Sequence, residues 1–224
     1  MLIKQSSIET RTALTVLAHP DDAELACFGL LAKLRKNGWR VVICIVTRGE
    51  NGADPTQWDR LNEARVAAAL IDAEIVVGDF IDGFVPRTRE LISWTEAMLV
   101  DHRPDLIVSH HVGESRTAHQ DHVAVEAAVQ IAVRRTDWLP TLLLAEDTDH
   151  DPAFRPNWFV DITDEFETKL AAIEMHSSQS QKYYMRSDYQ KLRSNRWALN
   201  FTAQSHEVAL SKYYEAYFLV QQVN

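Results

Sequence analysis

The chain has 224 residues and a formal net charge of −9, with 46% hydrophobic and 25% charged residues. These proportions are those of an ordinary soluble globular protein. The negative charge argues against nucleic acids and anionic membranes as main partners, because both require a basic face. A chain of this length can bury a large core. We therefore expect one domain over residues 1–224.

Cysteine use and hydropathy bear on the compartment. The two cysteines, Cys27 and Cys44, do not suggest a disulfide framework, and they favour a reducing environment. Residues 1–10 lack the apolar segment of a signal peptide, and no apolar run approaches the ~18 residues of a membrane span. We expect a cytoplasmic protein that does not cross a membrane. The sequence leaves the oligomeric state open, and a homo-oligomer is compatible with it.

Short apolar runs alternate with helical periodicity in the first two thirds of the chain. The runs, each typical of a strand buried on both faces, are Leu14–Ala18, Val41–Val46, Ile75–Val77, Leu106–Ser109 and Thr141–Ala145. Helices are expected between them at 23–37, 58–70, 88–101 and 120–134. Short connections between such units predict an α/β fold with a mainly parallel sheet covered by helices.

Beyond Asp147 this alternation weakens. A last strand is expected at Asn157–Thr163, followed by helices near 164–176, 188–200 and 206–219. We expect residues 148–224 to form a helical C-terminal segment that packs on the core of residues 13–147 and shapes the functional site.

The most informative segment is Ala18-His19-Pro20-Asp21-Asp22-Ala23-Glu24, where the first strand gives way to a helix. A helix start could explain part of it, with Asp21 as the cap and Glu24 completing a capping box. That interpretation leaves His19 unexplained, and it gives no reason for a second acid, Asp22, beside the first. We therefore favour a chemical role for this segment.

A second segment, His119-Gln120-Asp121-His122, stands at the start of the helix expected at 120–134. Thr117 could be an ordinary helix cap there, with Gln120 at the third helical position. His119 and His122 are three residues apart, however, so they share a helix face and can point into one cavity. Because ligands bind outside the carboxyl ends of parallel strands, the two segments are expected to meet.

Together the segments supply the donors of a metal site. His19, Asp22 and His122 fit as ligands of a divalent cation such as zinc, with a fourth position left for water, and iron(II) suits the same nitrogen and oxygen donors. Such a cation lowers the pKa of a bound water to about 7. The remaining acid, Asp21, is then a candidate general base. This set of groups suits hydrolysis of an amide.

Three further histidine and aspartate side chains are candidates for supporting roles. His119 could stabilise an oxyanion or protonate a leaving amine. Asp121 could orient an imidazole, and His110, which ends a strand, could lie behind the metal ligands or simply in the core. The sequence does not decide whether His176 lines the pocket or is exposed on a helix.

The two segments together resemble the PIG-L/LmbE-like family of zinc-dependent N-deacetylases. Four weaker matches follow in order between residue 47 and residue 179: Thr47-Arg48-Gly49-Glu50-Asn51-Gly52, Arg60-Leu61-Asn62-Glu63-Ala64, Asp82-Gly83 and His176-Ser177-Ser178-Gln179. The resemblance runs from residue 13 to about residue 180. It implies a Rossmann-like, three-layer fold and removal of an acetyl group from an N-acetylglucosamine-type sugar.

The resemblance also implies roles for single residues. It assigns zinc binding to His19, Asp22 and His122, the base to Asp21, stabilisation of the tetrahedral intermediate to His119, and substrate contacts to Asp82 and Arg48. Thr117 stands where some members of the family carry a tyrosine.

Two other functions remain open from the sequence. One is an amidase that cleaves a thiol conjugate or another amide at the same site, and the other is a non-catalytic sugar-binding module. A nucleotide-cofactor enzyme is rejected, because the seven glycines form no G-x-G-x-x-G segment after a strand.

Overall fold

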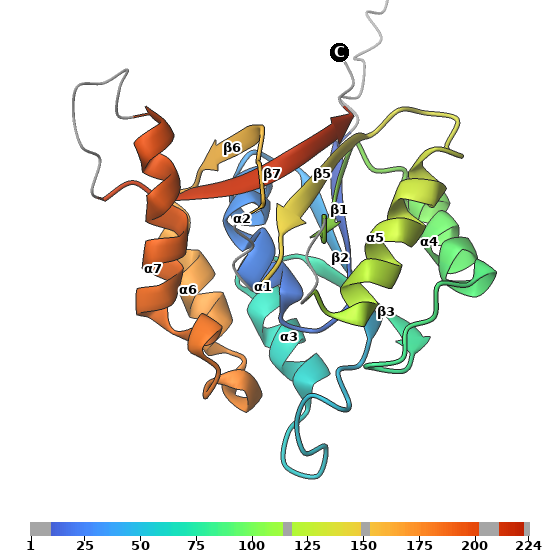
Figure 1. Ribbon diagram of the computed structural model, residues 1–224, viewed down its shortest axis with the longest axis horizontal. Helices are drawn as coiled ribbons and strands as arrows, with labels where there is room; N and C mark the ends of the chain where they lie inside the picture. Colours follow the sequence, from blue (N-terminus) through green and yellow to red (C-terminus); the bar gives the residue numbers. More distant parts are fainter. Residues whose placement is uncertain (1–9, 114–117, 149–152, 202–210, 222–224) are drawn as a thin grey trace, which may run out of the picture.

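The structure is a computed structural model that describes residues 10–113, 118–148, 153–201 and 211–221. Seven strands form one sheet in the order β3-β2-β1-β4-β5-β7-β6, with helices on both faces (Figure 1). The strands are β1 (Thr12–Leu17), β2 (Arg40–Thr47), β3 (Glu74–Phe80), β4 (Leu106–His111), β5 (Thr141–Glu146), β6 (Trp158–Asp161) and β7 (Tyr214–Gln221). The α-helices are α1 (Asp22–Ala26), α2 (Phe28–Lys36), α3 (Arg60–Ala69), α4 (Arg89–His102), α5 (Gln120–Val133), α6 (Phe166–Glu174) and α7 (Ser187–Asn195).

The strands β1 to β5 are parallel, as the alternating pattern predicts. At the centre, β1 pairs with β2 on one side and β4 on the other, so Ala13 lies opposite both Val41 and Leu106. The strand order reverses its direction of growth between β1 and β4. This reversal opens a crevice at the carboxyl ends of these two strands, where ligands of such sheets bind. The α/β, mainly parallel, three-layer prediction is confirmed.

Two buried cores, one on each face of the sheet, explain the continuous apolar runs. Leu17 and Ile43 belong to the core under α2, α3 and α6. Leu14 and Val42 belong to the core under α4 and α5. Because neither face is left to water, both sets of alternating side chains must be apolar. In the described part of the chain, no helix combines the length and hydropathy needed to cross a membrane.

The helix expected at 23–37 is interrupted at Cys27, which ends α1 and precedes α2. At the start of α2, a carboxylate from near the other end of the chain accepts the hydrogen bonds of the free backbone amides. Glu215 accepts from the amides of Gly29 at 2.9 Å and Leu30 at 2.7 Å. A carboxylate at this position satisfies free N–H groups and suits the positive end of the helix. The sequence around Cys27 contains no sign of this distant partner.

The helix expected at 206–219 is wrong. Residues 202–210 lie outside the described residues, and Tyr214–Gln221 form β7, which is antiparallel to both β5 and β6. The aromatic and branched side chains of this stretch favour a strand, and neighbours on both sides satisfy its backbone. The other C-terminal expectations are confirmed: β6 lies within Asn157–Thr163, α6 within 164–176, and α7 covers most of 188–200.

The buried ion pair that ties β7 to α6 gives a test of this arrangement. The Lys169 ammonium donates to Glu215 at 2.6 Å, and both residues are buried. Glu215→Gln leaves the ammonium without its counterion, so we expect the free energy of unfolding in urea to fall by about 3–5 kcal/mol. Glu167→Gln, the same change at an exposed position of α6, is the control. Equal urea midpoints of unfolding for Glu215→Gln and Glu167→Gln would show that the pair of Lys169 and Glu215 does not stabilise the position of β7.

Candidate active site

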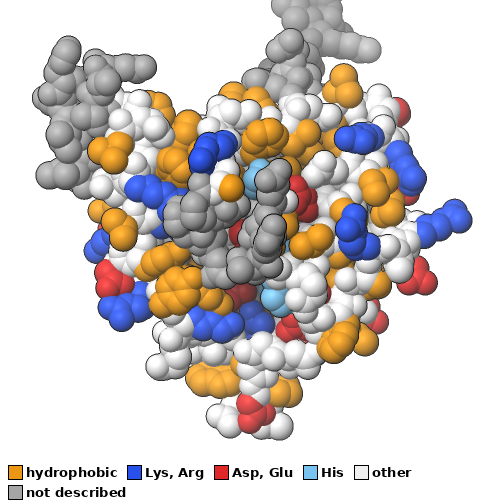
Figure 2. Space-filling view, in the orientation of Figure 1, with side chains coloured by type: hydrophobic (Ala, Val, Ile, Leu, Met, Phe, Trp, Pro, Cys, Tyr) orange, Lys and Arg blue, Asp and Glu red, His pale blue; other side chains and the backbone are white. Residues whose placement is uncertain are grey.

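A pocket of about 290 Å³ opens at the carboxyl ends of the parallel strands. Loops after different strands supply its walls: His19, Asp21 and Asp22 follow β1, Asp82 follows β3, and Asp147 follows β5. Histidine side chains are visible near the centre of the molecule in the space-filling view, with acidic side chains beside them (Figure 2). The pocket therefore lies in the crevice that the strand order predicts.

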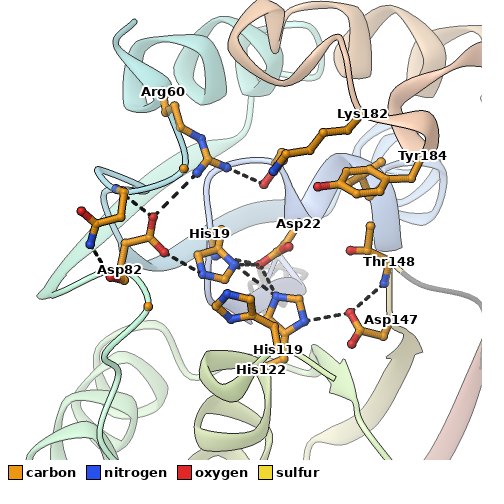
Figure 3. Close-up of a pocket in the computed structure, with 15 residues that line it drawn as sticks. His19, Asp22, Arg60, Asp82, His119, His122, Asp147, Thr148, Lys182 and Tyr184 are labelled. Carbon is orange, nitrogen blue, oxygen red and sulfur yellow. Dashed lines mark hydrogen bonds and ion pairs between the residues drawn. The ribbon is translucent and has the colours of Figure 1, made fainter. Parts of the chain in front are cut away.

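The three expected metal ligands converge on one point (Figure 3). Nδ1 of His19 is 3.1 Å from Nε2 of His122, and Oδ2 of Asp22 is 3.3 Å and 3.4 Å from those two nitrogens. Ligand atoms about 2.0–2.1 Å from a tetrahedral cation lie about 3.3–3.4 Å apart. The three atoms therefore have the mutual spacing of three corners of a zinc tetrahedron. The amide of His19 donates to Asp22 Oδ2 at 2.7 Å, which holds this carboxylate in place.

The outer nitrogens of the two imidazoles face acids, and this favours the tautomers that carry their protons on those nitrogens. His19 Nε2 is 3.1 Å from Asp82 and 3.2 Å from Asp121, and His122 Nδ1 is 2.8 Å from Asp147. Protons on these outer nitrogens leave two lone pairs and a carboxylate oxygen facing one another. Two ring nitrogens and a carboxylate oxygen directed at one point are ligand atoms for a cation, so the donor set fits a divalent metal.

The pKa of His122 supports the same conclusion. Burial by itself lowers this pKa, but the carboxylates of Asp22 and Asp147 outweigh burial and raise it to about 10. The pKa of His19 is likewise raised, against the effect of burial, by Asp22, Asp121 and Asp82. The acids around both rings thus stabilise positive charge at this point of the molecule. A bound metal ion would supply that charge in place of protons on the two rings.

Asp21, the candidate base, lies beside the metal ligands and is held by a buried arginine. Arg60, at the start of α3, donates to Asp21 Oδ1 at 2.9 Å and to the carbonyl of Gly49 at 3.1 Å. Asp21 occupies the cap position of α1 but makes no side-chain hydrogen bond to the helix. The capping explanation of this acid is therefore not what the structure shows.

His119 lies at the rim of the pocket, with its side chain 42% exposed. Its Nδ1 accepts a hydrogen bond from the amide of Asp121 at 3.3 Å, so the proton of a neutral ring is on Nε2. Burial lowers the pKa of His119, and the neighbouring His19 and His122 lower it further. A neutral ring that offers an Nε2–H group is suited to donate a hydrogen bond to a developing negative charge.

Two of the expected supporting residues are buried behind the ligands. Asp121 accepts hydrogen bonds from the amides of Gly83 at 2.7 Å and Val85 at 3.0 Å while facing His19. His110 stacks on His122 with ring centroids 3.9 Å apart, and its Nε2 accepts from the amide of Ala18 at 3.0 Å. Burial lowers the pKa of His110 to about 3, so this ring is neutral.

The two expected substrate contacts have different positions. Asp82 lines the pocket and is held through its Oδ2 by the amide of Asn51 at 3.1 Å. Arg48 lies instead beside a neighbouring hollow of about 270 Å³, and its guanidinium is 3.8 Å from Asp79. The structure thus does not bring Arg48 into the pocket, and Arg60 is the arginine that lines it. A substrate contact of Arg48 stays a prediction.

Several pocket residues escaped the sequence analysis. Asp147 directly follows β5, so the rule that ligands gather at carboxyl ends of strands could have identified it. Lys182 reaches the pocket from the C-terminal segment, where no pattern indicates it. Tyr184, one of the C-terminal tyrosines that the sequence leaves open between stacking on a sugar ring and packing, also lines the pocket, and its hydroxyl points inward (Figure 3). Thr117, the departure from the family pattern, lies outside the described residues.

Comparison with known proteins gives the family. The family model described as PIG-L, GlcNAc-PI de-N-acetylase, matches residues 14–133. The chain belongs to the PIG-L deacetylase family. A deacetylase of Escherichia coli K12, named YaiS and otherwise uncharacterised, is 30% identical over 178 residues, which cover 77% of this chain and 94% of that protein. Removal of an acetyl group by a deacetylase is a hydrolysis, so a protein named a deacetylase is a hydrolase.

Two further proteins are similar at lower identity. Diacetylchitobiose deacetylase of Thermococcus kodakarensis is 26% identical over 197 residues, covering 76% of this chain and 71% of that protein. The crystal structure of GalB, a 4-carboxy-2-hydroxymuconate hydratase of Pseudomonas putida KT2440, superposes with a TM-score of 0.82 over 96% of this chain and 98% of that one, at 19% identity. At such identity this likeness shows the fold alone.

The Asp147 carboxylate gives a test of the metal centre. In Asp147→Ala, His122 loses the acceptor that orients its ring and keeps its Nε2 lone pair toward the other ligands. We expect zinc affinity, measured by competition with a chelating dye, to fall about 10–100-fold. Asp79→Ala, at an exposed position near the end of the parallel strand β3, should bind zinc like the unaltered protein. Unchanged affinity in Asp147→Ala would place the cation elsewhere.

Proposed function

We propose that the protein is a zinc-dependent deacetylase that removes the N-acetyl group from N-acetylglucosamine-type amino sugars or their conjugates. The observation that carries this proposal is the convergence of His19, Asp22 and His122 within 3.4 Å of one another. A further acid, Asp21, lies beside them in the same pocket. Membership of the PIG-L family supports the class of reaction.

A divalent cation at these three residues would act as a Lewis acid on the amide carbonyl. It would also lower the pKa of water, so that deprotonated water is available to attack near neutral pH. The chain itself must move the protons. Arg60 occupies Oδ1 of Asp21, so we assign Oδ2 to accept the proton of the attacking water. Asp21 then returns that proton to the leaving amine, which completes acetate release without another acid.

The remaining pocket residues have roles that follow from their positions. The Nε2–H group of His119 stabilises the negative oxygen that develops on the acetyl carbon, because its ring is neutral and its Nδ1 is already occupied. Asp82 and the polar walls around it offer acceptors to sugar hydroxyls. The T. kodakarensis relative, whose name specifies an acetylated sugar, supports an amino-sugar substrate.

An amidase acting on a thiol conjugate would use the same centre, so only the substrate separates it from the proposal. A non-catalytic sugar-binding module is disfavoured by the buried pair of Asp21 and Arg60, which places a second acid next to the metal ligands without satisfying a helix cap.

The base assignment is tested by Asp21→Asn. The amide keeps the size of the side chain but cannot accept the proton, so acetate release from N-acetylated sugars should fall about 10²–10⁴-fold. Zinc content should stay at that of the unaltered protein, because Asp21 is not among the three converging donors. Normal turnover in this variant would contradict the role of Asp21. Cleavage of acylated thiol conjugates, without any acetylated sugar being cleaved, would favour the amidase.

Metal removal tests the dependence on a cation. Protein dialysed against a chelator should release no acetate, and one equivalent of zinc should restore activity, since three donors fit one ion. Iron(II), added under anaerobic conditions, tests the second metal that suits these donors. Full activity of the chelated protein, with metal content verified by elemental analysis, would exclude the proposed mechanism.

A further inference from the structure

The first turn of α1 concentrates negative charge inside the protein. Asp21, Asp22 and Glu24 are 5%, 4% and 1% exposed. Three carboxylates cannot remain ionised and buried so close together unless each has a positive partner. The partners of these acids therefore determine the position of this turn. The turn positions the side chains of Asp21, the proposed base, and Asp22, the proposed metal ligand.

Two of the three acids have partners in the centre already described. Asp21 is paired with Arg60 of α3 at 2.9 Å. Asp22 lies between His19 and His122, at the point that fits a cation. Glu24 contributes nothing to the pocket, and its partner comes from another part of the chain.

His176, the residue between α6 and the short helix η1 (Ser177–Gln179), faces Glu24. Its Nε2 lies 3.4 Å from Glu24 Oε2, and the residue is 1% exposed. Neither ring nitrogen has a well-aligned hydrogen bond among the residues that the structure describes. The link to Glu24 is thus mainly an attraction between charges, which is strong in a buried environment.

The acids around His176 favour the charged form of its ring. Burial lowers the pKa of this imidazole, but the carboxylates of Glu24, Asp21 and Glu63 outweigh burial and raise it. The expectation that His176 is either exposed or in the pocket is therefore replaced by a third position, behind the wall of the pocket.

The residues after His176 bind the neighbouring walls. Ser178 donates to Glu63 of α3 from its amide at 2.9 Å and from its hydroxyl at 2.5 Å. Gln179 donates to the carbonyl of Gly52 at 3.2 Å. The segment His176–Gln179 thus contacts α1, α3 and the loop after β2, and each of these three elements supplies side chains to the pocket.

We propose that His176 is a positioning residue: its buried ring, 3.4 Å from Glu24, holds this acid and thereby fixes the first turn of α1, so that Asp22 faces His19 and His122 while Asp21 faces the attacking water. The catalytic part of this inference rests on the proposed deacetylase function, whereas the part that concerns metal binding does not.

The test compares His176→Gln, Glu24→Gln and the double variant. His176→Gln leaves a buried carboxylate without a cation, so the turn should shift: zinc affinity should fall at least about 10-fold, and kcat should fall with KM nearly unchanged. Glu24→Gln should be milder, because a buried imidazole can lose its proton. The double variant buries two neutral amides and should recover most of the affinity and of kcat lost in His176→Gln.

Leu170→Ala is the matched control for stability. This variant removes a buried apolar side chain from α6 and leaves the ion pair intact, so it should lower the unfolding temperature without changing zinc affinity or kcat. A purely structural role of His176 predicts the same behaviour for His176→Gln.

Two outcomes would overturn the proposal. One is zinc affinity and kcat in His176→Gln equal to those of the unaltered protein, and the other is a double variant no better than His176→Gln. If the unaltered protein released no acetate from any substrate, the proposed function would fail, but the zinc affinities of the four variants would still decide the role of His176.

Discussion

The constraint on which the site depends is the burial of three carboxylates at the end of β1, the central strand where the order of the sheet reverses. Water cannot solvate them there, so other parts of the chain must supply positive groups. Arg60 does so for Asp21 and His176 for Glu24. Asp22 faces nitrogens of three imidazoles, those of His19, His110 and His122. Of the three acids, Asp22 alone faces several imidazole nitrogens, and this distinguishes the proposed metal ligand from its neighbours.

This constraint also explains why segments far apart in the sequence must pack accurately. The segments after β1, β3 and β5 and the first turn of α5, which follows β4, supply the proposed ligands and the acids that orient them. The C-terminal segment reaches back to α1 and α3 through residues 176–179. The buried carboxylate of Glu215, on β7, anchors the start of α2 and the ammonium of Lys169. Contacts behind the pocket wall therefore stabilise the position of the site residues, in addition to the contacts that these residues make with one another inside the pocket.

Much of this could be predicted from the sequence, because the relevant signals are local. The apolar runs give the parallel strands, and two short segments that follow strands give His19, Asp22 and His122. The remainder depends on contacts that have no local signal. Glu215 and Lys169 are separated by 46 residues, and nothing near Tyr214 indicates that two strands will flank it. Arg60 has no such signal as a site residue, because its role is set by a partner 39 residues away. Asp147 differs, because its place directly after β5 is a local signal of a site residue.

The most direct test of the account is to locate the cation by anomalous X-ray scattering at the zinc edge, from crystals of the protein loaded with one equivalent of zinc. The account predicts a single strong peak about 2.0–2.2 Å from Nδ1 of His19, an oxygen of Asp22 and Nε2 of His122, with a solvent ligand at the fourth position. A peak bound by other side chains, or full turnover in crystals without a peak between these three residues, would contradict it.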